Sequence, residues 1–254
     1  MDMFSLSGRT ALITGGSRGI GLSLAQALAK AGAAVILNGR DQATLDQAAA
    51  LLRDAGAAKV ATAAFDVTDV AAVRAGIAAI EADGVAIDIL VNNAGIQRRA
   101  PLHDFSDDDW HELMRTNLDS VYFVSKAVAP HMIARGRGKI INIASVQAEL
   151  ARPTIAPYTA SKGAIRNLTR GMCADWARFG IQTNAIAPGY FDTPLNKALV
   201  EDPAFDAWLK GRTPAGRWGR LEDLHGLAVL LASPASDFIC GQTLYVDGGV
   251  TSVI

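Results

Sequence analysis

The sequence contains little cysteine, little histidine and little excess charge. Cys173 and Cys240 are the only cysteines, they lie far apart, and neither belongs to a Cys-x-x-Cys pair or to a Cys/His cluster at metal-ligand spacing. The sequence therefore predicts neither a disulfide framework nor a metal site. Because disulfides are typical of oxidising compartments, it favours a reducing, cytoplasmic one.

Charged residues make up 19% of the chain and the formal net charge is −1. This balance gives no basic patch of the kind that binds nucleic acid or an anionic membrane. The segment Met1–Leu6 lacks the basic start and apolar core of a signal peptide, and no apolar run reaches membrane-spanning length. We therefore expect no nucleic-acid partner and no membrane segment, and we favour a small-molecule partner.

Short aliphatic runs alternate with Ala/Leu-rich amphipathic stretches along the 254 residues. Continuous apolar strands separated by helices predict a parallel sheet covered on both faces, a doubly wound α/β fold. We expect one domain over residues 1–254. The predicted strands are 10–14, 34–37, 60–64, 87–91, 139–143, 181–186 and 243–246, and the predicted helices are 19–31, 42–55, 70–82, 107–135, 159–179 and 221–232.

A glycine-rich turn follows the first predicted strand and precedes a helix. Glycines let the backbone approach a pyrophosphate, and the helix N-terminus directs unpaired N–H groups at it. Glycines also close ordinary strand–helix turns, but this position favours a dinucleotide site. The candidate residues are Gly15, Ser17, Arg18, Gly19, Ile20 and Gly21.

The end of the second strand indicates which cofactor binds. An acidic residue there is typical of NAD enzymes, whereas an arginine accommodates the 2′-phosphate of NADP. This chain has Asn38 and Arg40, with Arg18 available from the glycine turn. We therefore predict NADP rather than NAD. Asp41 is the alternative signal, but it falls past the strand and is equally suited to cap the next helix.

Polar residues also follow the later strands, at the edge where open α/β sheets bind ligands. They comprise Asp66 and Val67 after the third strand, Asn93, Ala94 and Gly95 after the fourth, Ser145 after the fifth, and Pro188, Gly189 and Thr193 after the sixth. Asp66 is nearly as typical of an exposed turn as of a ligand-binding position. Arg98 and Arg99 follow Gly95, and at least one of them is suited to pair with an anionic substrate.

Tyr158 and Lys162 lie four residues apart, on one face of a predicted helix. A tyrosine needs its pKa lowered from about 10 to act as a base near neutrality, and a cation about 4 Å away supplies most of that shift. The pair alone is more typical of an ordinary surface helix. Its meaning depends on the rest of the chain.

Taken together, these patterns resemble the short-chain dehydrogenase/reductase family over essentially the whole chain. The motifs that carry the resemblance are Thr14-Gly15-x-x-x-Gly19-x-Gly21, Asn92-Asn93-Ala94-Gly95, Asn117, Ser145, Tyr158-x-x-x-Lys162 and Pro188-Gly189. The resemblance implies a Rossmann-type domain with a seven-stranded parallel sheet, and usually a homotetramer. It implies that Tyr158 is the general acid/base, that Lys162 tunes it and holds the nicotinamide ribose, and that Ser145 orients the substrate. Asn117 would hold a water in the proton relay, and Thr193, with the backbone near Pro188 and Gly189, would hold the carboxamide.

Loop stretches narrow the resemblance to the gluconate 5-dehydrogenase branch of this family. They include 92–99, 145–150, 187–191, 197–202 and 212–219. The implied reaction interconverts D-gluconate and 5-dehydro-D-gluconate, and the runner-up substrate is 2-dehydro-3-deoxy-D-gluconate or another polyol or sugar acid. Possible sugar-acid partners are Arg99, Gln147, Glu149, Arg152 and Tyr190, and we select Arg99, Gln147 and Tyr190, with Ser145 and Tyr158, as substrate-binding residues.

Two further expectations remain. The connection 190–220 is longer than such folds usually need, so we predict a substrate lid there. A different class of protein, a non-catalytic NADP-binding sensor or scaffold, is the alternative. Such proteins typically lack the tyrosine or the lysine, whereas this chain has Tyr158, Lys162, Ser145 and Asn117.

Overall fold

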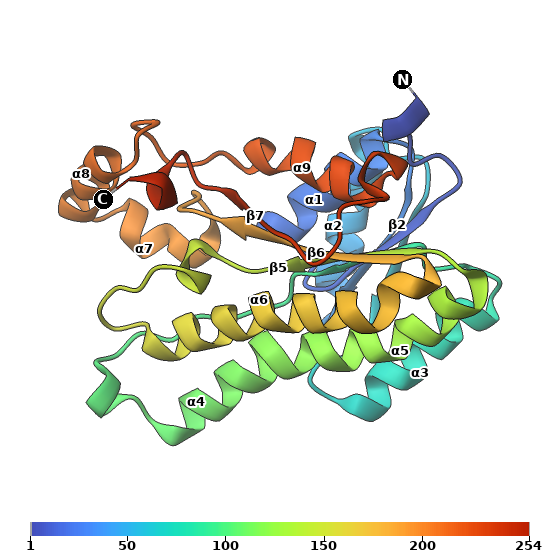
Figure 1. Ribbon diagram of the computed structural model, residues 1–254, viewed down its shortest axis with the longest axis horizontal. Helices are drawn as coiled ribbons and strands as arrows, with labels where there is room; N and C mark the ends of the chain where they lie inside the picture. The colour runs from blue at the N-terminus through green and yellow to red at the C-terminus, as the bar shows by residue number, and fades with distance from the viewer. Residues whose placement is uncertain (1, 254) are drawn as a thin grey trace.

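A computed structural model describes residues 2–253, and Figure 1 shows a central sheet between two layers of helices. The seven strands are all parallel, in the order β3-β2-β1-β4-β5-β6-β7. Their bounds are β1 (Thr10–Ile13), β2 (Ala34–Gly39), β3 (Val60–Ala64), β4 (Ile89–Asn92), β5 (Gly138–Ile143), β6 (Ile181–Pro188) and β7 (Thr243–Val246). The predicted doubly wound single-domain fold is confirmed.

The α-helices among the described residues are α1 (Gly19–Lys30), α2 (Gln42–Asp54), α3 (Val70–Ala82), α4 (Asp107–Met114), α5 (Ser120–Arg135), α6 (Ala156–Trp176), α7 (Lys197–Val200), α8 (Pro203–Arg212) and α9 (His225–Ala232). In Figure 1, α1, α2 and α9 lie on one side of the sheet and α3, α4, α5 and α6 on the other. Helices α7 and α8 lie at one end of the molecule, beyond β6.

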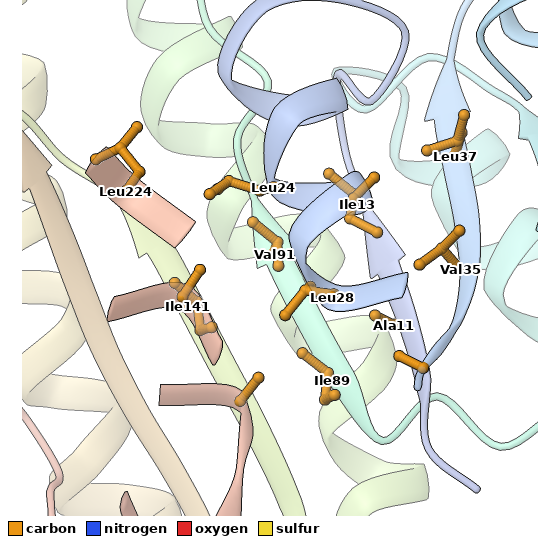
Figure 2. Close-up of a cluster of buried hydrophobic side chains, with 14 of the residues drawn as sticks. Ala11, Ile13, Leu24, Leu28, Val35, Leu37, Ile89, Val91, Ile141 and Leu224 are labelled. Atoms are coloured by element: carbon orange, nitrogen blue, oxygen red, sulfur yellow. The ribbon is translucent and has the colours of Figure 1, made fainter. Parts of the chain in front are cut away.

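Alternate residues of β1 lie in two different hydrophobic clusters, one on each face of the sheet. Ile13 on β1 packs with Leu24 and Leu28 of α1 on one face of the sheet, as Figure 2 shows. Leu12 lies in the other cluster, which includes Val124 of α5. Both faces of the strands are therefore buried, and this is why the strands read as continuous apolar runs rather than as alternating ones.

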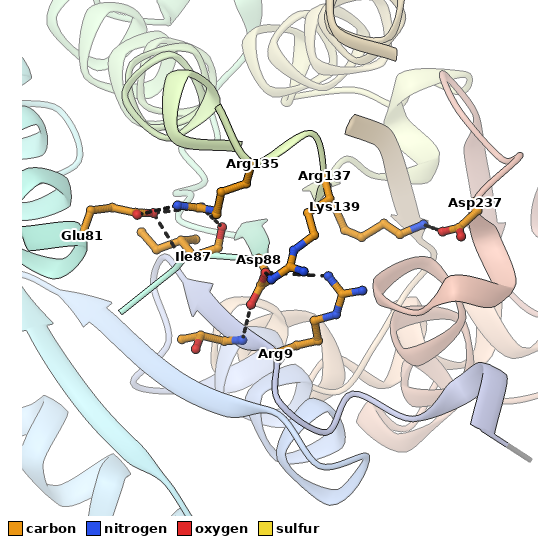
Figure 3. Close-up of polar contacts among 9 residues, drawn as sticks. Arg9, Glu81, Ile87, Asp88, Arg135, Arg137, Lys139 and Asp237 are labelled. Carbon is orange, nitrogen blue, oxygen red and sulfur yellow. Dashed lines mark hydrogen bonds and ion pairs between the residues drawn. The ribbon is translucent and has the colours of Figure 1, made fainter. Parts of the chain in front are cut away.

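The carboxyl ends of the strands meet at one edge, and neighbouring β1 and β4 are followed by connections to opposite faces of the sheet. This is the switch point at which open α/β sheets hold ligands. The opposite, amino-terminal edge is closed by ion pairs around buried Asp88, which lies 3.3 Å from Arg137 and 3.7 Å from Arg9 (Figure 3). The carboxyl edge is therefore the one suited to bind a ligand, and the amino-terminal edge is held together by ion pairs.

The structure revises three of the predicted elements. The expected helix 107–135 contains a π-helical turn at Arg115–Asp119, between α4 and α5. The predicted helix 221–232 begins with a 3-10 turn at Leu221–Leu224 before α9. The segment 190–220, expected only as a lid, contains α7 and α8.

Candidate active site

A cavity of about 610 Å³ runs along the carboxyl edge of the sheet. It is lined by the glycine turn after β1 and by the residues that follow β2, β3, β4, β5 and β6. Every site residue predicted from the sequence lines it except Gly21 and Asn117, which do not appear on its surface. Residues scattered from 15 to 193 are thus brought into one continuous space.

The glycine turn is shaped by close backbone approach. A Cβ on Gly21 would lie 2.3 Å from the Gly15 carbonyl oxygen, and Gly15 itself has a φ of +60°, in the left-handed region. Helix α1 begins here, and its N-cap residue Arg18 provides no side-chain cap. The first N–H groups of α1 therefore remain available for an anion such as a pyrophosphate.

Thr14 and Asn93 fasten the glycine turn to the end of β4. The Thr14 hydroxyl accepts hydrogen bonds from the backbone N–H groups of Asn93, at 2.9 Å, and Ala94, at 3.1 Å. The Asn93 side chain donates to the carbonyl oxygens of Thr14 and Gly15, both at 3.0 Å. Asn93 therefore positions the turn through its side chain while it also lines the cavity.

The far end of the cavity carries the two arginines predicted to select the cofactor. Arg18 and Arg40 are both exposed, and neither forms an ion pair with any residue that the structure describes. Asp41 accepts hydrogen bonds from the backbone N–H of Thr44 at 2.7 Å and from its hydroxyl, so it caps α2. That observation favours the capping interpretation of Asp41 over a ribose-binding one.

Two other residues at this end are held by local hydrogen bonds. Asn38 is buried and donates to the carbonyl oxygens of Ala63, at 3.0 Å, and Phe65, at 3.1 Å, so its amide ties β2 to β3. The Asp66 carboxylate accepts from the backbone N–H and the hydroxyl of Thr68, both at 2.8 Å. The polar lining is therefore oriented before any ligand arrives.

Tyr158 and Ser145 form the centre of the cavity. Burial raises the pKa of the Tyr158 phenol above its usual value, while a hydrogen bond with the Ser145 hydroxyl and the charge of Arg99 act in the opposite direction. Ser145 is itself fixed, because its oxygen accepts from the backbone N–H of Gln147 at 3.2 Å. The two hydroxyls thus stand side by side at the end of β5 and the start of α6.

Lys162 does not direct its ammonium at the phenol. Its Nζ donates to the Ile143 carbonyl oxygen at 2.7 Å and lies 5.6 Å from the centre of the Tyr158 ring. Only 5% of Lys162 is exposed, and burial lowers its pKa to about 8. That Lys162 lowers the pKa of Tyr158 stays a prediction, and Ser145 and Arg99 are the groups that act against the effect of burial here.

Asn117 sits in the π-helical turn and supports the cavity wall from behind. Its side-chain oxygen accepts from the Ile96 N–H at 2.7 Å, and its amide donates to the Ile96 carbonyl oxygen at 3.0 Å and to the Ser161 hydroxyl at 3.3 Å. The side chain is thus committed to the loop after β4. π-turns inside helices are frequent at functional sites, and nothing in the local sequence distinguishes this one.

The adjacent arginines separate at the substrate end. Arg98 pairs with Asp109 at 3.2 Å and with Glu112 at 2.7 Å, whereas Arg99 lines the cavity. Burial, followed by the charge of Arg152, lowers the pKa of Arg99. Arg99 is therefore the one of the two placed to meet a ligand.

Glu149, one of the five possible sugar-acid partners, is turned elsewhere. It pairs with Arg166 and accepts from the Tyr245 hydroxyl at 3.2 Å, and it does not line the cavity. A carboxylate facing the cavity would repel an anionic substrate, and Glu149 does not face it. Arg152, another of those five, does line the cavity.

An aromatic wall that the sequence did not predict stands beside this end. Tyr190 accepts a hydrogen bond from the Gln147 amide at 3.3 Å, and its ring centre lies 5.7 Å from that of Phe205 and 6.2 Å from that of Trp218. Phe205 belongs to α8, and the Trp218 indole N–H donates to Asp206 at 2.8 Å. The segment after β6 is thus anchored to the cavity through Tyr190.

Over residues 2–253, no helix is long and apolar enough to cross a membrane. No group of three or more His, Cys, Asp or Glu side chains in that range is arranged to hold a metal ion.

A parallel sheet with a glycine turn at its switch point, and a tyrosine, a serine and a lysine in the same cavity, define a nicotinamide-dependent oxidoreductase of the Rossmann type. A family model described as enoyl-(acyl carrier protein) reductase matches residues 15–251. The chain belongs to the short-chain dehydrogenase/reductase family.

Within the family, the chain is similar to proteins that act on sugar acids. It is 61% identical to a gluconate 5-dehydrogenase of Gluconobacter oxydans (strain 621H) over 98% of this chain and 97% of that one. It is 51% identical to a 5-keto-D-gluconate 5-reductase of Escherichia coli (strain K12), with 98% of each chain covered. It superimposes with a TM-score of 0.97 and 64% identity on a crystal structure of a gluconate 5-dehydrogenase from Burkholderia cenocepacia J2315 in complex with NADP and tartrate, over 100% of this chain and 99% of that one.

Proposed function

We propose that this protein catalyses the NADP-dependent interconversion of D-gluconate and 5-dehydro-D-gluconate. The observation that carries the proposal is the placement of Tyr158, Ser145 and Arg99 in one cavity. The two hydroxyls can act on the reacting carbon of a substrate whose carboxylate is bound by Arg99. The similarity over nearly the whole chain to enzymes named for this reaction supports it.

The residues that line the cavity suit NADP in their chemistry. The backbone of the glycine turn and the open N-terminus of α1 suit the pyrophosphate, and a Cβ at Gly21 would close that space. Arg18 and Arg40 would hold the 2′-phosphate, with Asn38, Asp66 and Val67 around the adenosine. Asn93, Ala94 and Gly95 would lie under the middle of the cofactor, and Pro188, Gly189 and Thr193 would hold its carboxamide.

The chain's own residues manage the proton and the geometry. Bound NADP⁺ supplies a hydride acceptor at C4 of its nicotinamide. In the oxidation direction, the Tyr158 phenolate takes the proton of the C5 hydroxyl, while the Ser145 hydroxyl donates to the same substrate oxygen and fixes its position. Lys162, held at the Ile143 carbonyl, would contact the nicotinamide ribose, and Asn117, held by Ile96 and Ser161, would hold a water of the proton relay.

The substrate would lie with its carboxylate towards Arg99. An arginine binds a carboxylate with two parallel hydrogen bonds. Binding the carboxylate end of the sugar acid at Arg99 therefore fixes which end of its hydroxylated chain faces the Tyr158 phenol. Gln147 and Tyr190, already hydrogen-bonded to each other, offer a donor and an acceptor for the intervening hydroxyls.

The experiment compares substrates and cofactors in one assay that follows reduced nicotinamide by absorbance. Purified protein is given D-gluconate, D-glucitol or 2-dehydro-3-deoxy-D-gluconate with NADP⁺ or NAD⁺, and the reverse reaction uses 5-dehydro-D-gluconate with NADPH. We expect the highest kcat/KM with gluconate and NADP⁺. Turnover of one of the other substrates at a higher kcat/KM would overturn the substrate assignment and leave the family intact.

We further propose that the segment 190–220 closes over the substrate and that the protein works as a cytoplasmic homotetramer. The contacts of Tyr190 with Phe205 and Trp218 support the first, because they join α8 to the cavity wall. Family resemblance supports the second. Light scattering of the purified protein would measure its mass, and a mass of one chain would contradict the tetramer.

A further inference from the structure

Two guanidinium groups share the substrate end of the cavity. Arg99 comes from the loop after β4 and Arg152 from the loop between Ser145 and α6, and both line the same space. They are close enough for the charge of Arg152 to lower the pKa of Arg99. Like charges in a partly buried site raise each other's energy, and an anion that contacts both relieves that repulsion.

The acidic residues on this side of the molecule are engaged elsewhere. Glu112 lines the cavity but accepts from Arg98 at 2.7 Å, and Glu149 pairs with Arg166. Arg152 forms no ion pair with any of the described residues. The anion that would compensate Arg152 therefore has to come from the ligand.

Arg152 is already oriented. Its guanidinium carbon lies 5.6 Å from the centre of the Phe205 ring on α8, and the Tyr190 hydroxyl is within its hydrogen-bonding reach. Its Nε is buried and makes no hydrogen bond within the described residues, and the same holds for the Gln147 side-chain oxygen. Buried donors and acceptors are nearly always paired in a finished site, so the Arg152 Nε marks a place for a ligand oxygen that accepts, and the Gln147 oxygen a place for a ligand hydroxyl that donates.

We propose that Arg152 acts with Arg99 as a second ligand of the substrate carboxylate, and that the pair makes the cavity select sugar acids over neutral polyols of the same chain length. This proposal deepens the proposed function and rests on it for the carbon chain of the substrate. A neutral polyol would leave the charge of Arg152 without an anion and its Nε unpaired. The two oxygens of a carboxylate can accept hydrogen bonds from Arg152, including its Nε, and from Arg99.

The test measures binding without turnover. Protein saturated with NADPH is titrated calorimetrically with D-gluconate and, separately, with D-glucitol, because neither polyol can be oxidised by the reduced cofactor. In Arg152→Gln we expect the affinity for gluconate to fall about 10- to 100-fold, the range of lost hydrogen bonds to a charged group, while the affinity for glucitol changes less than about twofold. Arg170→Gln, which removes an exposed arginine of α6 that does not line the cavity, serves as the matched control and should change neither.

Two further measurements complete the test. Arg152→Lys keeps the positive charge and the aliphatic part of the side chain but loses the planar guanidinium that binds a carboxylate with two hydrogen bonds. An affinity for gluconate between those of the native protein and Arg152→Gln would therefore indicate lost carboxylate binding and not lost folding. NADPH affinity in each variant reports an intact fold. Unchanged gluconate affinity in Arg152→Gln, or equal affinity of the native protein for gluconate and glucitol, would overturn the proposal.

The proposed function fails independently of this inference. If the native protein binds gluconate through Arg152 but gives no product with NADP⁺, the reaction assigned above is wrong and the carboxylate site stands. If it oxidises gluconate and Arg152→Gln has the native KM for gluconate, the reaction stands and the carboxylate site is wrong.

Discussion

Lys162 lies one helical turn from Tyr158, yet its ammonium points to the Ile143 carbonyl oxygen at 2.7 Å and its Nζ is 5.6 Å from the centre of the tyrosine ring. The lysine is almost fully buried, and burial lowers its pKa to about 8. A cation is therefore held in a poor environment for a charge. Such a residue is expected to cost stability in exchange for function.

Lys162→Met should make the protein more stable and inactive. The pKa of Lys162 is about 8 when folded and 10.5 ordinarily, so the unfolded chain binds more protons between these values and native stability rises with pH across that window. Below pH 8 the full cost applies, roughly 3 kcal/mol from the shift, and the lost hydrogen bond offsets about 1 of it. We expect a gain of about 1–3 kcal/mol at pH 7 in urea unfolding.

The pH dependence provides the control for that measurement. The variant should lack the rise in stability above pH 8 that the native protein shows, whereas Lys126→Met, at an exposed position on α5, should keep it. A destabilised Lys162→Met protein at pH 7 would show that the contact with Ile143 outweighs the buried charge.

Tyr158→Phe should abolish turnover without abolishing cofactor binding. The proposed mechanism uses the Tyr158 phenol, which is hydrogen-bonded to Ser145, as its general acid/base. Removal of a general acid/base typically costs about 10²- to 10⁴-fold in kcat. NADPH affinity, followed by its fluorescence, should change less than about twofold, because the ring remains. Turnover close to native would instead support a non-catalytic, cofactor-binding protein.

Arg99→Ala should raise KM for gluconate about 10- to 100-fold, which is the expected loss for hydrogen bonds to a charged group. KM for NADP⁺ should stay nearly constant, since Arg99 lines the other end of the cavity from Arg18 and Arg40. Steady-state kinetics with each substrate varied in turn measures both values. Arg170→Ala, at an exposed position outside the cavity, is the paired control, and equal increases in both KM values for Arg99→Ala would refute the carboxylate role.

The strands were predictable because burial on both faces leaves a strong apolar signal. β3 and β7 match their predicted bounds, and the others differ by one or two residues. The π-turn around Asn117 was not predictable, because its residues have ordinary helical propensity and the extra residue is accommodated only by the contacts with Ile96 and Ser161.

The substrate end shows a different limit. Arg98 and Arg99 are identical in type and adjacent in sequence, and they differ in that Arg98 pairs with Asp109 and Glu112 of α4, whereas Arg99 lines the cavity. Likewise, Phe205 reaches Tyr190 and Arg152 only because α8 folds back against the cavity. Sequence patterns give residue type and strand end, whereas these partnerships depend on tertiary packing.

Cofactor choice should reverse when the two exposed arginines are removed. In Arg18→Ala and Arg40→Ala we expect NADP⁺ affinity to fall about 10-fold or more each, because a charge-assisted contact to the 2′-phosphate is lost, with NAD⁺ affinity unchanged. Arg53→Ala, which alters α2 only where it contacts the Val60 carbonyl, is the control. If NAD⁺ and NADP⁺ weaken together, the arginines support the loop and do not read the phosphate.

Asp88→Ala should destabilise the fold and leave the active site intact. Asp88 is 3% exposed, accepts from the Thr10 N–H at 3.1 Å and faces Arg137 and Arg9 (Figure 3). Breaking a buried pair costs about 3–5 kcal/mol, and the partial exposure of both arginines reduces our expectation to about 2–4.

Urea unfolding measures the effect of Asp88→Ala against Glu201→Ala, which removes an exposed pair with Lys197 and should cost less than about 1 kcal/mol. Turnover per folded molecule should be native in Asp88→Ala, because Asp88 lies at the amino-terminal edge of the sheet, away from the cavity. Equal small losses in the two variants would mean that Asp88 is as weakly coupled to the fold as a surface carboxylate.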